Sequence, residues 1–270
     1  METTISTLKT KSESGTREWA GKNINIIDGC AHDCRYCYAK EMAIRFKRAT
    51  VDGWKNETLR EEAGTAVYQK FEGPVMFPSA HDITPKNLAH AMLVLQKLLE
   101  VGNEVLVVTK PHLSCVKRIC TNLMQYKSQI EFRFTIGSSD SETLKFWEPG
   151  APSFEERLAA LKYAHRAHFK TSISCEPFFD EEIENLIWLL EEYATHSIWV
   201  GMANSLSRRL TINGHADAET LERAKHLKEV VYSEKNIRRI FSNFCTDINV
   251  RWKGELKKVM QRLHPDFPMF

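Results

Sequence analysis

The sequence predicts an α/β protein in which repeated strand and helix units form a mostly parallel sheet. Short apolar stretches alternate along the chain with amphipathic stretches whose apolar residues recur every three or four positions. This alternation is typical of parallel strands joined by helical crossovers. The 270 residues, 43% of them hydrophobic, are enough to build one sizeable domain.

The expected strands are six short runs rich in apolar and β-branched residues. They span residues 23–27, 75–78, 104–109, 131–136, 171–175 and 198–202. Four apolar stripes at helical spacing are expected to be core faces. Their members are Leu88, Met92, Leu95 and Leu99; Phe154, Leu158 and Leu161; Ile183, Leu186 and Leu190; and Leu221, Ala224, Leu227 and Val231. Another helix is expected over 38–48, and residues 50–72 lengthen the first connection beyond a simple loop.

The expected organisation is a polar N-terminal tail over 1–18, a catalytic core over 19–205 and a helical or mixed extension over 206–270 that packs on the core.

A formal charge of +2 is too small to indicate a nucleic-acid-binding protein by itself. No apolar run approaches the roughly 20 residues of a membrane span, and residues 1–18 have no hydrophobic signal core. We therefore expect no membrane partner and a cytoplasmic location, where free thiols persist.

Three closely spaced cysteines, Cys30, Cys34 and Cys37, form a C-x3-C-x2-C motif with Tyr36 before the last of them. Three thiolates on one loop can hold three corners of a [4Fe-4S] cluster and leave the fourth iron open. A structural zinc site needs four ligands, and His32 could be the fourth, but four donors in so short a segment would strain the loop. A ferredoxin-type cluster needs four cysteines, one more than this loop has. The odd total of seven cysteines disfavours a disulfide framework.

Four segments together are similar to the radical S-adenosylmethionine (radical SAM) superfamily, in its spore-photoproduct-lyase-like branch. They are Asp28-Gly29-Cys30, Cys37-Tyr38-Ala39, Phe77-Pro78-Ser79, and the Glu148-Pro149 stretch that ends at Arg157. The resemblance covers roughly residues 20–205. It implies a partial (βα)6 TIM-like barrel, and a [4Fe-4S] cluster on the three cysteines that reductively cleaves S-adenosylmethionine to a 5'-deoxyadenosyl radical for hydrogen abstraction. A one-electron reductant such as flavodoxin or ferredoxin is implied as a partner.

The resemblance also implies roles for polar residues at the ends of the second and third strands. Ser79 and Asp82 occupy the position of the segment that holds the methionine amine of the cofactor, and Lys110 the position of a lysine that pairs with its carboxylate. A structural alternative is that Asp82 or Thr84 caps a helix. His81 is a candidate proton relay or substrate contact, or a hydrogen-bonding loop residue.

Residues after the later strands are further candidates for cofactor binding. Ser138 and Ser139 offer hydroxyls for the ribose or the methionine carboxylate; alternatively, they form a turn. Glu176 offers a carboxylate, and Asn204 offers an amide near the expected adenine. Tyr36 and Tyr38 flank the third thiol, where one of them is expected to pack beside the cluster or adenine. A structural ion pair between Glu148 and Arg157 is expected to fix the loop to its helix.

The motifs do not identify one substrate. Spore photoproduct lyase uses a further cysteine after its second strand as hydrogen donor, whereas this chain has Ser79 and His81 there. Cys175 is the candidate donor from another strand, or a buried structural thiol. Nucleic acid (for repair or modification), a peptide and a small metabolite are the candidate substrates.

Basic and aromatic residues in the C-terminal third suggest a nucleic-acid partner, with arginines for phosphates and Phe241, Phe244 and Trp252 for stacking on bases. The basic positions are Arg208, Arg209, Arg238, Arg239, Arg251, Lys253, Lys257 and Lys258. A zinc-stabilised nucleic-acid-binding protein is therefore the alternative from a different functional class.

Overall fold

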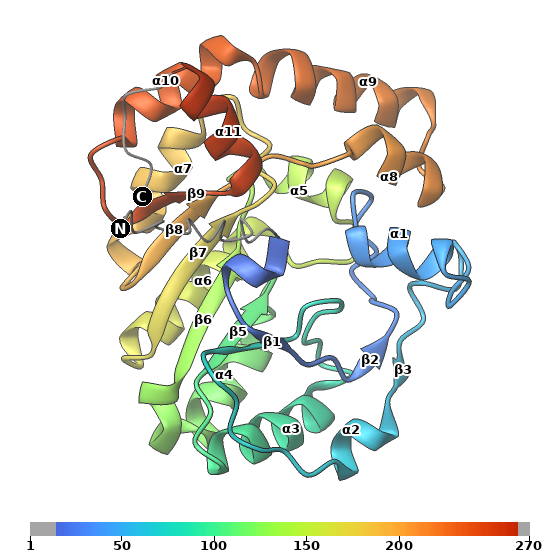
Figure 1. Ribbon diagram of the computed structural model, residues 1–270, viewed down its shortest axis with the longest axis vertical. Helices are drawn as coiled ribbons and strands as arrows, with labels where there is room; N and C mark the ends of the chain where they lie inside the picture. The colour runs from blue at the N-terminus through green and yellow to red at the C-terminus, as the bar shows by residue number, and fades with distance from the viewer. Residues whose placement is uncertain (1–14, 264–270) are drawn as a thin grey trace, which may run out of the picture.

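A parallel seven-stranded sheet forms the centre of the computed structural model, which describes residues 15–263 (Figure 1). Its strand order is β1-β4-β5-β6-β7-β8-β9, and every neighbouring pair is parallel. The strands are β1 (Lys22–Asn23), β4 (Val75–Phe77), β5 (Val105–Thr109), β6 (Ile130–Thr135), β7 (Lys170–Cys175), β8 (Ser197–Val200) and β9 (Val250–Trp252). Within the described residues no pairing joins β1 to β9, so the barrel is open.

Helices follow the strands and cover the outer face of the sheet (Figure 1). The α-helices are α1 (Tyr38–Arg45), α2 (Glu61–Thr65), α3 (Leu88–Glu100), α4 (Leu113–Asn122), α5 (Ser141–Trp147), α6 (Phe154–Arg166), α7 (Ile183–Leu190), α8 (Leu206–Ile212), α9 (Ala218–His226), α10 (Glu234–Phe244) and α11 (Gly254–Leu263). Short helical turns are η1 (Gly15–Glu18), η2 (Met124–Gln129), η3 (Glu191–Tyr193) and η4 (Leu227–Val231). The α/β prediction and its parallel sheet are confirmed. Within the described residues, no helix has both the length and the apolar character that a bilayer crossing requires.

The first expected strand is split in two. Only β1 joins the main sheet, whereas β2 (Ile27–Asp28) pairs antiparallel with β3 (Thr58–Leu59) from the long first connection. Between them, Asn25 accepts main-chain hydrogen bonds from Ser79 and Ala80, both at 2.8 Å. The polar Asn25 therefore fixes the loop after β4 where a continuous strand was expected.

The C-terminal extension adds a strand to the sheet. In β9, which pairs with β8, Val250 and Trp252 are buried and Arg251 is exposed. Three residues inside a charged region give too short an alternation to be recognised in the sequence. Of the expected N-terminal tail, residues 1–14 lie outside the described part of the chain, and η1 forms directly after them.

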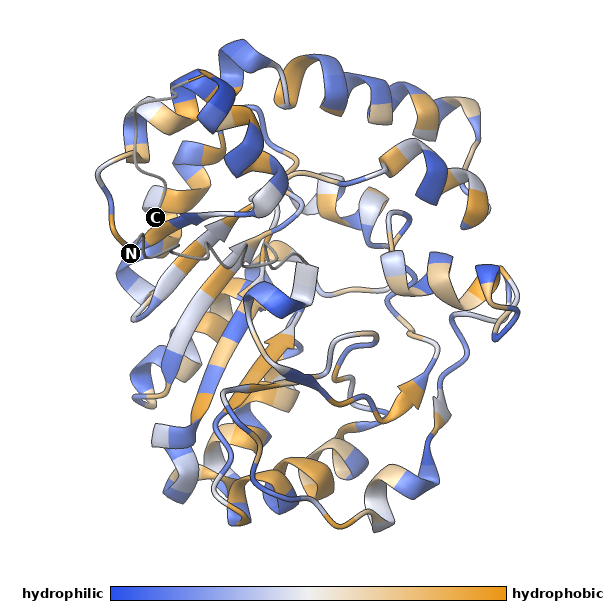
Figure 2. Cartoon of the chain, in the orientation of Figure 1, coloured by the Kyte–Doolittle hydropathy of each residue, from blue (hydrophilic) through white to orange (hydrophobic). Residues whose placement is uncertain are grey.

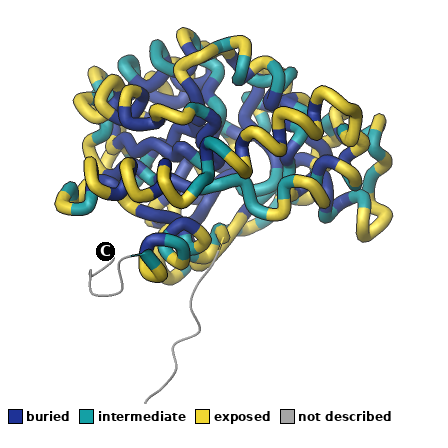
Figure 3. The backbone as a smooth tube through the Cα atoms, turned by 90° about the horizontal axis from the view of Figure 1, so that it is seen from above, coloured by how far each residue is buried: buried dark blue, intermediate teal, exposed yellow. Residues whose placement is uncertain are grey.

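The core lies between the strands and the inner faces of their helices. Figure 2 shows hydrophobic residues on the strands and on the inward sides of the helices, and Figure 3 shows buried segments surrounded by exposed ones. Nearly all residues of the expected stripes are buried or packed against the core. Leu221 is the exception: it is 41% exposed on α9, so its assignment to the core was wrong.

Candidate functional site

The three motif cysteines lie at one cavity of about 480 Å³ beside the carboxyl ends of the parallel strands. All three are free thiols; Cys30 and Cys34 are buried, and Cys37 is partly exposed. Among the described residues, no three His, Cys, Asp or Glu side chains converge closely enough to hold one metal ion. The three thiols thus share one cavity.

Glycines and main-chain hydrogen bonds shape the cysteine loop. Gly29 has a φ of +92°, and a Cβ there would lie 2.6 Å from the Trp54 oxygen, which accepts from the amide of Cys30 at 2.9 Å. Gly150 donates to the oxygen of His32 at 3.0 Å, and a Cβ on Gly150 would lie 2.1 Å from the Ala31 oxygen. Only glycine permits these two close approaches.

Two positive features face the thiols. Cys37 is the N-cap of α1, and its Sγ accepts from the amide of Lys40 at 3.4 Å, so the positive end of the helix dipole points at this sulfur. Burial raises the pKa of all three thiols, and the Lys110 ammonium offsets part of this rise at Cys34 and Cys37. The donor set therefore fits an anionic thiolate cluster, in which metal replaces the thiol protons.

Asn213, just after α8, holds the cysteine loop from the C-terminal extension. Its side chain has no solvent exposure, and Nδ2 donates to the main-chain oxygens of Arg35 and Cys37, both at 3.0 Å. Arg35 in turn donates to the Thr220 hydroxyl of α9 at 3.1 Å. Asn213 was not predicted from the sequence, because its partners lie 176 and 178 positions away.

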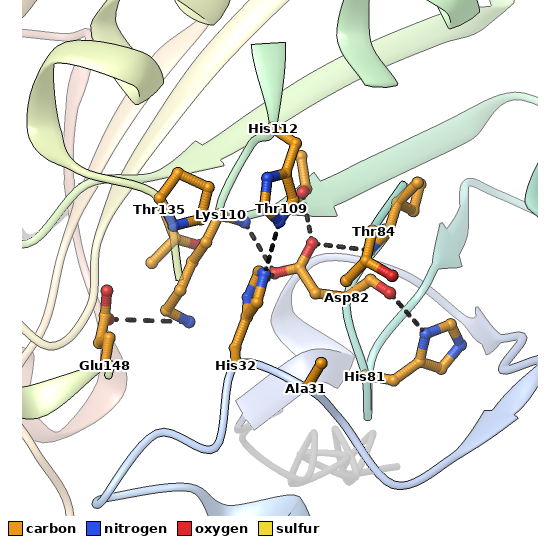
Figure 4. A network of polar contacts seen from close by, with 12 residues as sticks. Ala31, His32, His81, Asp82, Thr84, Thr109, Lys110, His112, Thr135 and Glu148 are labelled. Atoms are coloured by element: carbon orange, nitrogen blue, oxygen red, sulfur yellow. Dashed lines mark hydrogen bonds and ion pairs between the residues drawn. The ribbon is translucent and has the colours of Figure 1, made fainter. Parts of the chain in front are cut away.

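A buried network joins the cysteine loop to the ends of β4 and β5 (Figure 4). Asp82 Oδ2 lies 3.2 Å from His32 Nδ1, and His32 Nε2 lies 3.2 Å from His112 Nε2. Asp82 also accepts hydrogen bonds from the Lys110 amide at 2.8 Å and from the Thr109 hydroxyl. Burial alone would raise the pKa of Asp82, but His32, Lys110 and Thr109 lower it to about 2. Both carboxylate oxygens are thus engaged within the protein.

His81 lines the same cavity, and both of its ring nitrogens have main-chain partners. Nε2 accepts from the amide of Ile26 at 3.0 Å, which requires the ring proton on Nδ1, 3.0 Å from the oxygen of Asp82. Burial lowers the pKa of His81. This arrangement describes a neutral histidine that joins the first strand segment to the loop after β4.

Lys110 belongs to a second buried network on the other side of the cavity. Its Nζ lies 3.8 Å from Glu148 Oε1, and the same carboxylate accepts from the Tyr36 hydroxyl. Arg157, with no exposure, approaches Glu148 Oε2 at 2.5 Å and donates to the Thr135 oxygen at 3.1 Å. Burial opposes charge on Lys110, but the nearby Cys34, Glu148 and Asp82 outweigh it and raise the pKa. The expected Glu148–Arg157 ion pair is confirmed.

The structure brings most of the predicted cofactor-binding residues to this cavity. Those that line it are Tyr36, Tyr38, Ser79, Asp82, Lys110, Glu176 and Asn204. Ser138 and Ser139 are not among its lining residues and bind Asp180 instead: the Ser138 hydroxyl at 2.5 Å and the Ser139 amide at 3.1 Å. Cys175 is fully buried and also does not line the cavity.

The C-terminal aromatics expected to stack on bases do not reach the surface. Phe241, Phe244 and Trp252 are each no more than 4% exposed and belong to the core, so this expectation was wrong. Arg209 and Lys253 line the cavity, although neither was predicted to do so.

Comparisons with known proteins agree with this geometry. Residues 24–189 match the family model described as the radical SAM superfamily. The chain is 24% identical over 258 residues, 89% of this chain and 83% of the relative, to an uncharacterized protein, ORF301, of Acidianus two-tailed virus. A mutant of spore photoproduct lyase aligns with a TM-score of 0.56 at 18% identity, covering 92% of this chain and 79% of that one. A second mutant of that enzyme, with a dinucleoside spore photoproduct, aligns with a TM-score of 0.53 at 17% identity, covering 90% of this chain and 78% of that one. The fold is therefore the partial barrel of these structures.

Proposed function

Because this chain belongs to the radical SAM superfamily, we propose that Cys30, Cys34 and Cys37 bind a [4Fe-4S] cluster and that the adjoining cavity binds S-adenosylmethionine. The observation that carries the proposal is the presence of three free thiols at one cavity beside the carboxyl ends of parallel strands. When bound, the two groups supply an electron and a cleavable sulfonium, and hence a 5'-deoxyadenosyl radical that abstracts hydrogen from the substrate.

The residues of the chain hold and enclose these groups. The ammonium of Lys110 offers an ion pair to the methionine carboxylate, and it is oriented by Glu148, 3.8 Å away. Tyr36 and Tyr38 line the cavity and exclude water from the thiols. Asn213 fixes the carbonyls of Arg35 and Cys37, so the third thiol keeps its direction. We also propose that S-adenosylmethionine is contacted by four further residues that line the cavity: Ser79, Asp82, Glu176 and Asn204.

The substrate and net reaction are proposed only as a class. Spore photoproduct lyase carries a dinucleoside spore photoproduct in one of the matching structures, which supports a nucleic-acid substrate, repaired or modified. By the resemblance, Ser79 and His81 occupy the position of the donor cysteine of that lyase, which favours a different reaction. Cys175 as hydrogen donor stays a prediction, and because it is fully buried and does not line the cavity, its hydrogen would have to reach the substrate through another group. A one-electron carrier such as flavodoxin or ferredoxin is the proposed partner.

Electron paramagnetic resonance tests the cofactor assignment. Anaerobically reconstituted protein should be brown, contain about four irons and four sulfides per chain, and give a reduced-cluster signal that changes when S-adenosylmethionine is added. Cys34→Ala should lose the signal. A colourless wild-type protein with one bound zinc would contradict the proposal and favour a zinc-stabilised protein.

A further inference from the structure

Three arginines surround a single buried carboxylate beside the cysteine loop. Glu41, on α1, is only 3% exposed, and it is approached by Arg45 at 3.5 Å, by Arg209 at 3.6 Å and by Arg208 through a charge-assisted hydrogen bond. One negative charge among three guanidinium groups leaves two positive charges in excess. Since Glu41 holds the arginines in place, this excess charge is fixed in position rather than spread by side-chain motion.

The excess charge continues across an exposed surface. Lys47 and Arg48 follow α1 and are both exposed, while the side chains of Arg45 and Arg208 are 45% and 56% exposed. In the middle of this set, Phe46 is 61% exposed, and the guanidinium of Arg45 lies 5.9 Å from its ring centre. We call this set, Arg45, Phe46, Lys47, Arg48 and Arg208, the basic patch.

Nearby acidic side chains do not cancel the basic patch. Asp33 pairs with Lys40 at 2.7 Å, and Asp217 lies 3.7 Å from Arg35. Both carboxylates are therefore engaged with cations outside the patch, whereas Glu41 offsets one of its positive charges.

The basic patch lies close to the proposed cluster. α1 begins at the residue after Cys37 and packs against α8, which carries Arg208 (Figure 1). Eight residues of helix span about 12 Å, so the patch at the end of α1 and the third cysteine at its start are separated by about that length. Electron transfer requires such proximity, because tunnelling falls off steeply with distance.

Resting on the proposed function, we propose that the basic patch docks an acidic one-electron carrier protein, which passes one electron to the cluster and is itself oxidised by one electron. A small charged surface around one exposed aromatic suits the small, transient interfaces of electron-transfer complexes. Nucleic acid fits less well, because sequence-tolerant binding of single strands uses several stacking aromatics, and Phe241, Phe244 and Trp252 are buried.

Direct binding is the first test, and it needs no cluster. The full chain before reconstitution is titrated with an acidic flavodoxin at low ionic strength, and the affinity is measured by calorimetry. The double variant R45Q/R208Q should weaken binding about tenfold, and the difference should vanish near 0.5 M salt, where the Debye length is short. Arg209 is retained in the variant because it lines the cavity and still pairs with Glu41. Arg118→Gln, at an exposed arginine on α4, is the matched control and should bind as wild type does.

The reconstituted enzyme supplies a second readout. S-adenosylmethionine cleavage driven by reduced flavodoxin should fall about tenfold in R45Q/R208Q, while cleavage driven by dithionite should keep its wild-type rate. Equal losses with both reductants, or unchanged flavodoxin binding, would overturn the docking proposal. Unchanged flavodoxin binding with loss of binding to a labelled oligonucleotide would instead assign the patch to nucleic acid. If the wild-type enzyme did not cleave S-adenosylmethionine with dithionite, the proposed function itself would be refuted. This result is distinguishable from the outcomes that concern only the basic patch.

Discussion

Asn213 Nδ2 donates a hydrogen bond of 3.0 Å to the main-chain oxygen of Cys37, across 176 residues of sequence. The last cysteine of the motif is therefore oriented by the C-terminal extension and not only by its own loop. Because the Asn213 side chain has no exposure, we expect that water will not replace its hydrogen bonds when the amide is removed.

Replacing Asn213 with leucine should lower both stability and cluster content. Loss of two buried hydrogen bonds should reduce the free energy of unfolding by about 1–3 kcal/mol, measured by urea denaturation. Iron per chain after reconstitution should fall as well. Asn122→Leu, at an exposed position at the end of α4, should change neither quantity; similar iron content in both variants would show that Asn213 has no role in the loop.

The Asp82→Asn substitution should reduce stability in a pH-dependent way. The pKa of Asp82 is lowered from 3.8 to about 2, so the ionised group stabilises the fold above pH 4 and this contribution disappears as the pH falls through 2. The variant should be about 2 kcal/mol less stable near pH 6, with a smaller difference at pH 3. Urea denaturation of both proteins across this range measures the difference; a difference that is constant with pH would refute the assignment.

The Glu148→Gln substitution tests the second buried network. Because it leaves the fully buried Arg157 without its charged partner, we expect a loss of about 3–5 kcal/mol in the free energy of unfolding. Glu142→Gln, at an exposed position in the first turn of α5, serves as control in the same thermal and urea measurements. Equal stability of the two variants would show that the ion pair does not stabilise the fold.

Lys110 should matter for cofactor affinity more than for the cluster. Lys110→Met removes the cation that faces the cavity but leaves the Glu148–Arg157 pair, so we expect about tenfold weaker binding of S-adenosylmethionine. Iron content should stay at the wild-type level. Equilibrium dialysis of the reconstituted proteins measures the affinity, with Lys86→Met, at an exposed lysine before α3, as control. Unchanged affinity in Lys110→Met would place the methionine carboxylate elsewhere.

The strands were largely predictable because buried parallel strands are short, continuous apolar runs. β5 and β8 have such runs, whereas β6 and β7 intersperse apolar residues with polar ones; all four were expected within two residues of their ends. β9 was missed because it has three residues and an exposed arginine. Leu221 was misassigned because helical periodicity alone does not show which part of α9 faces the core.

The site was predictable where chemistry and local spacing coincide. The three cysteines share one short loop, and the sequence alone brings them together. Asn213 and His112 reach that loop through tertiary packing over long sequence separations, which no local pattern records. Phe241, Phe244 and Trp252 show the converse error, since aromatic residues among charges can belong to amphipathic elements that bury them.

The formation of 5'-deoxyadenosine tests the central claim most directly. Reconstituted wild type should produce it from S-adenosylmethionine with dithionite, Cys34→Ala should produce none, and Cys120→Ala, a buried thiol on α4 outside the cavity, should retain the activity. No product from wild type with a full complement of iron, or equal product from Cys34→Ala, would contradict the account.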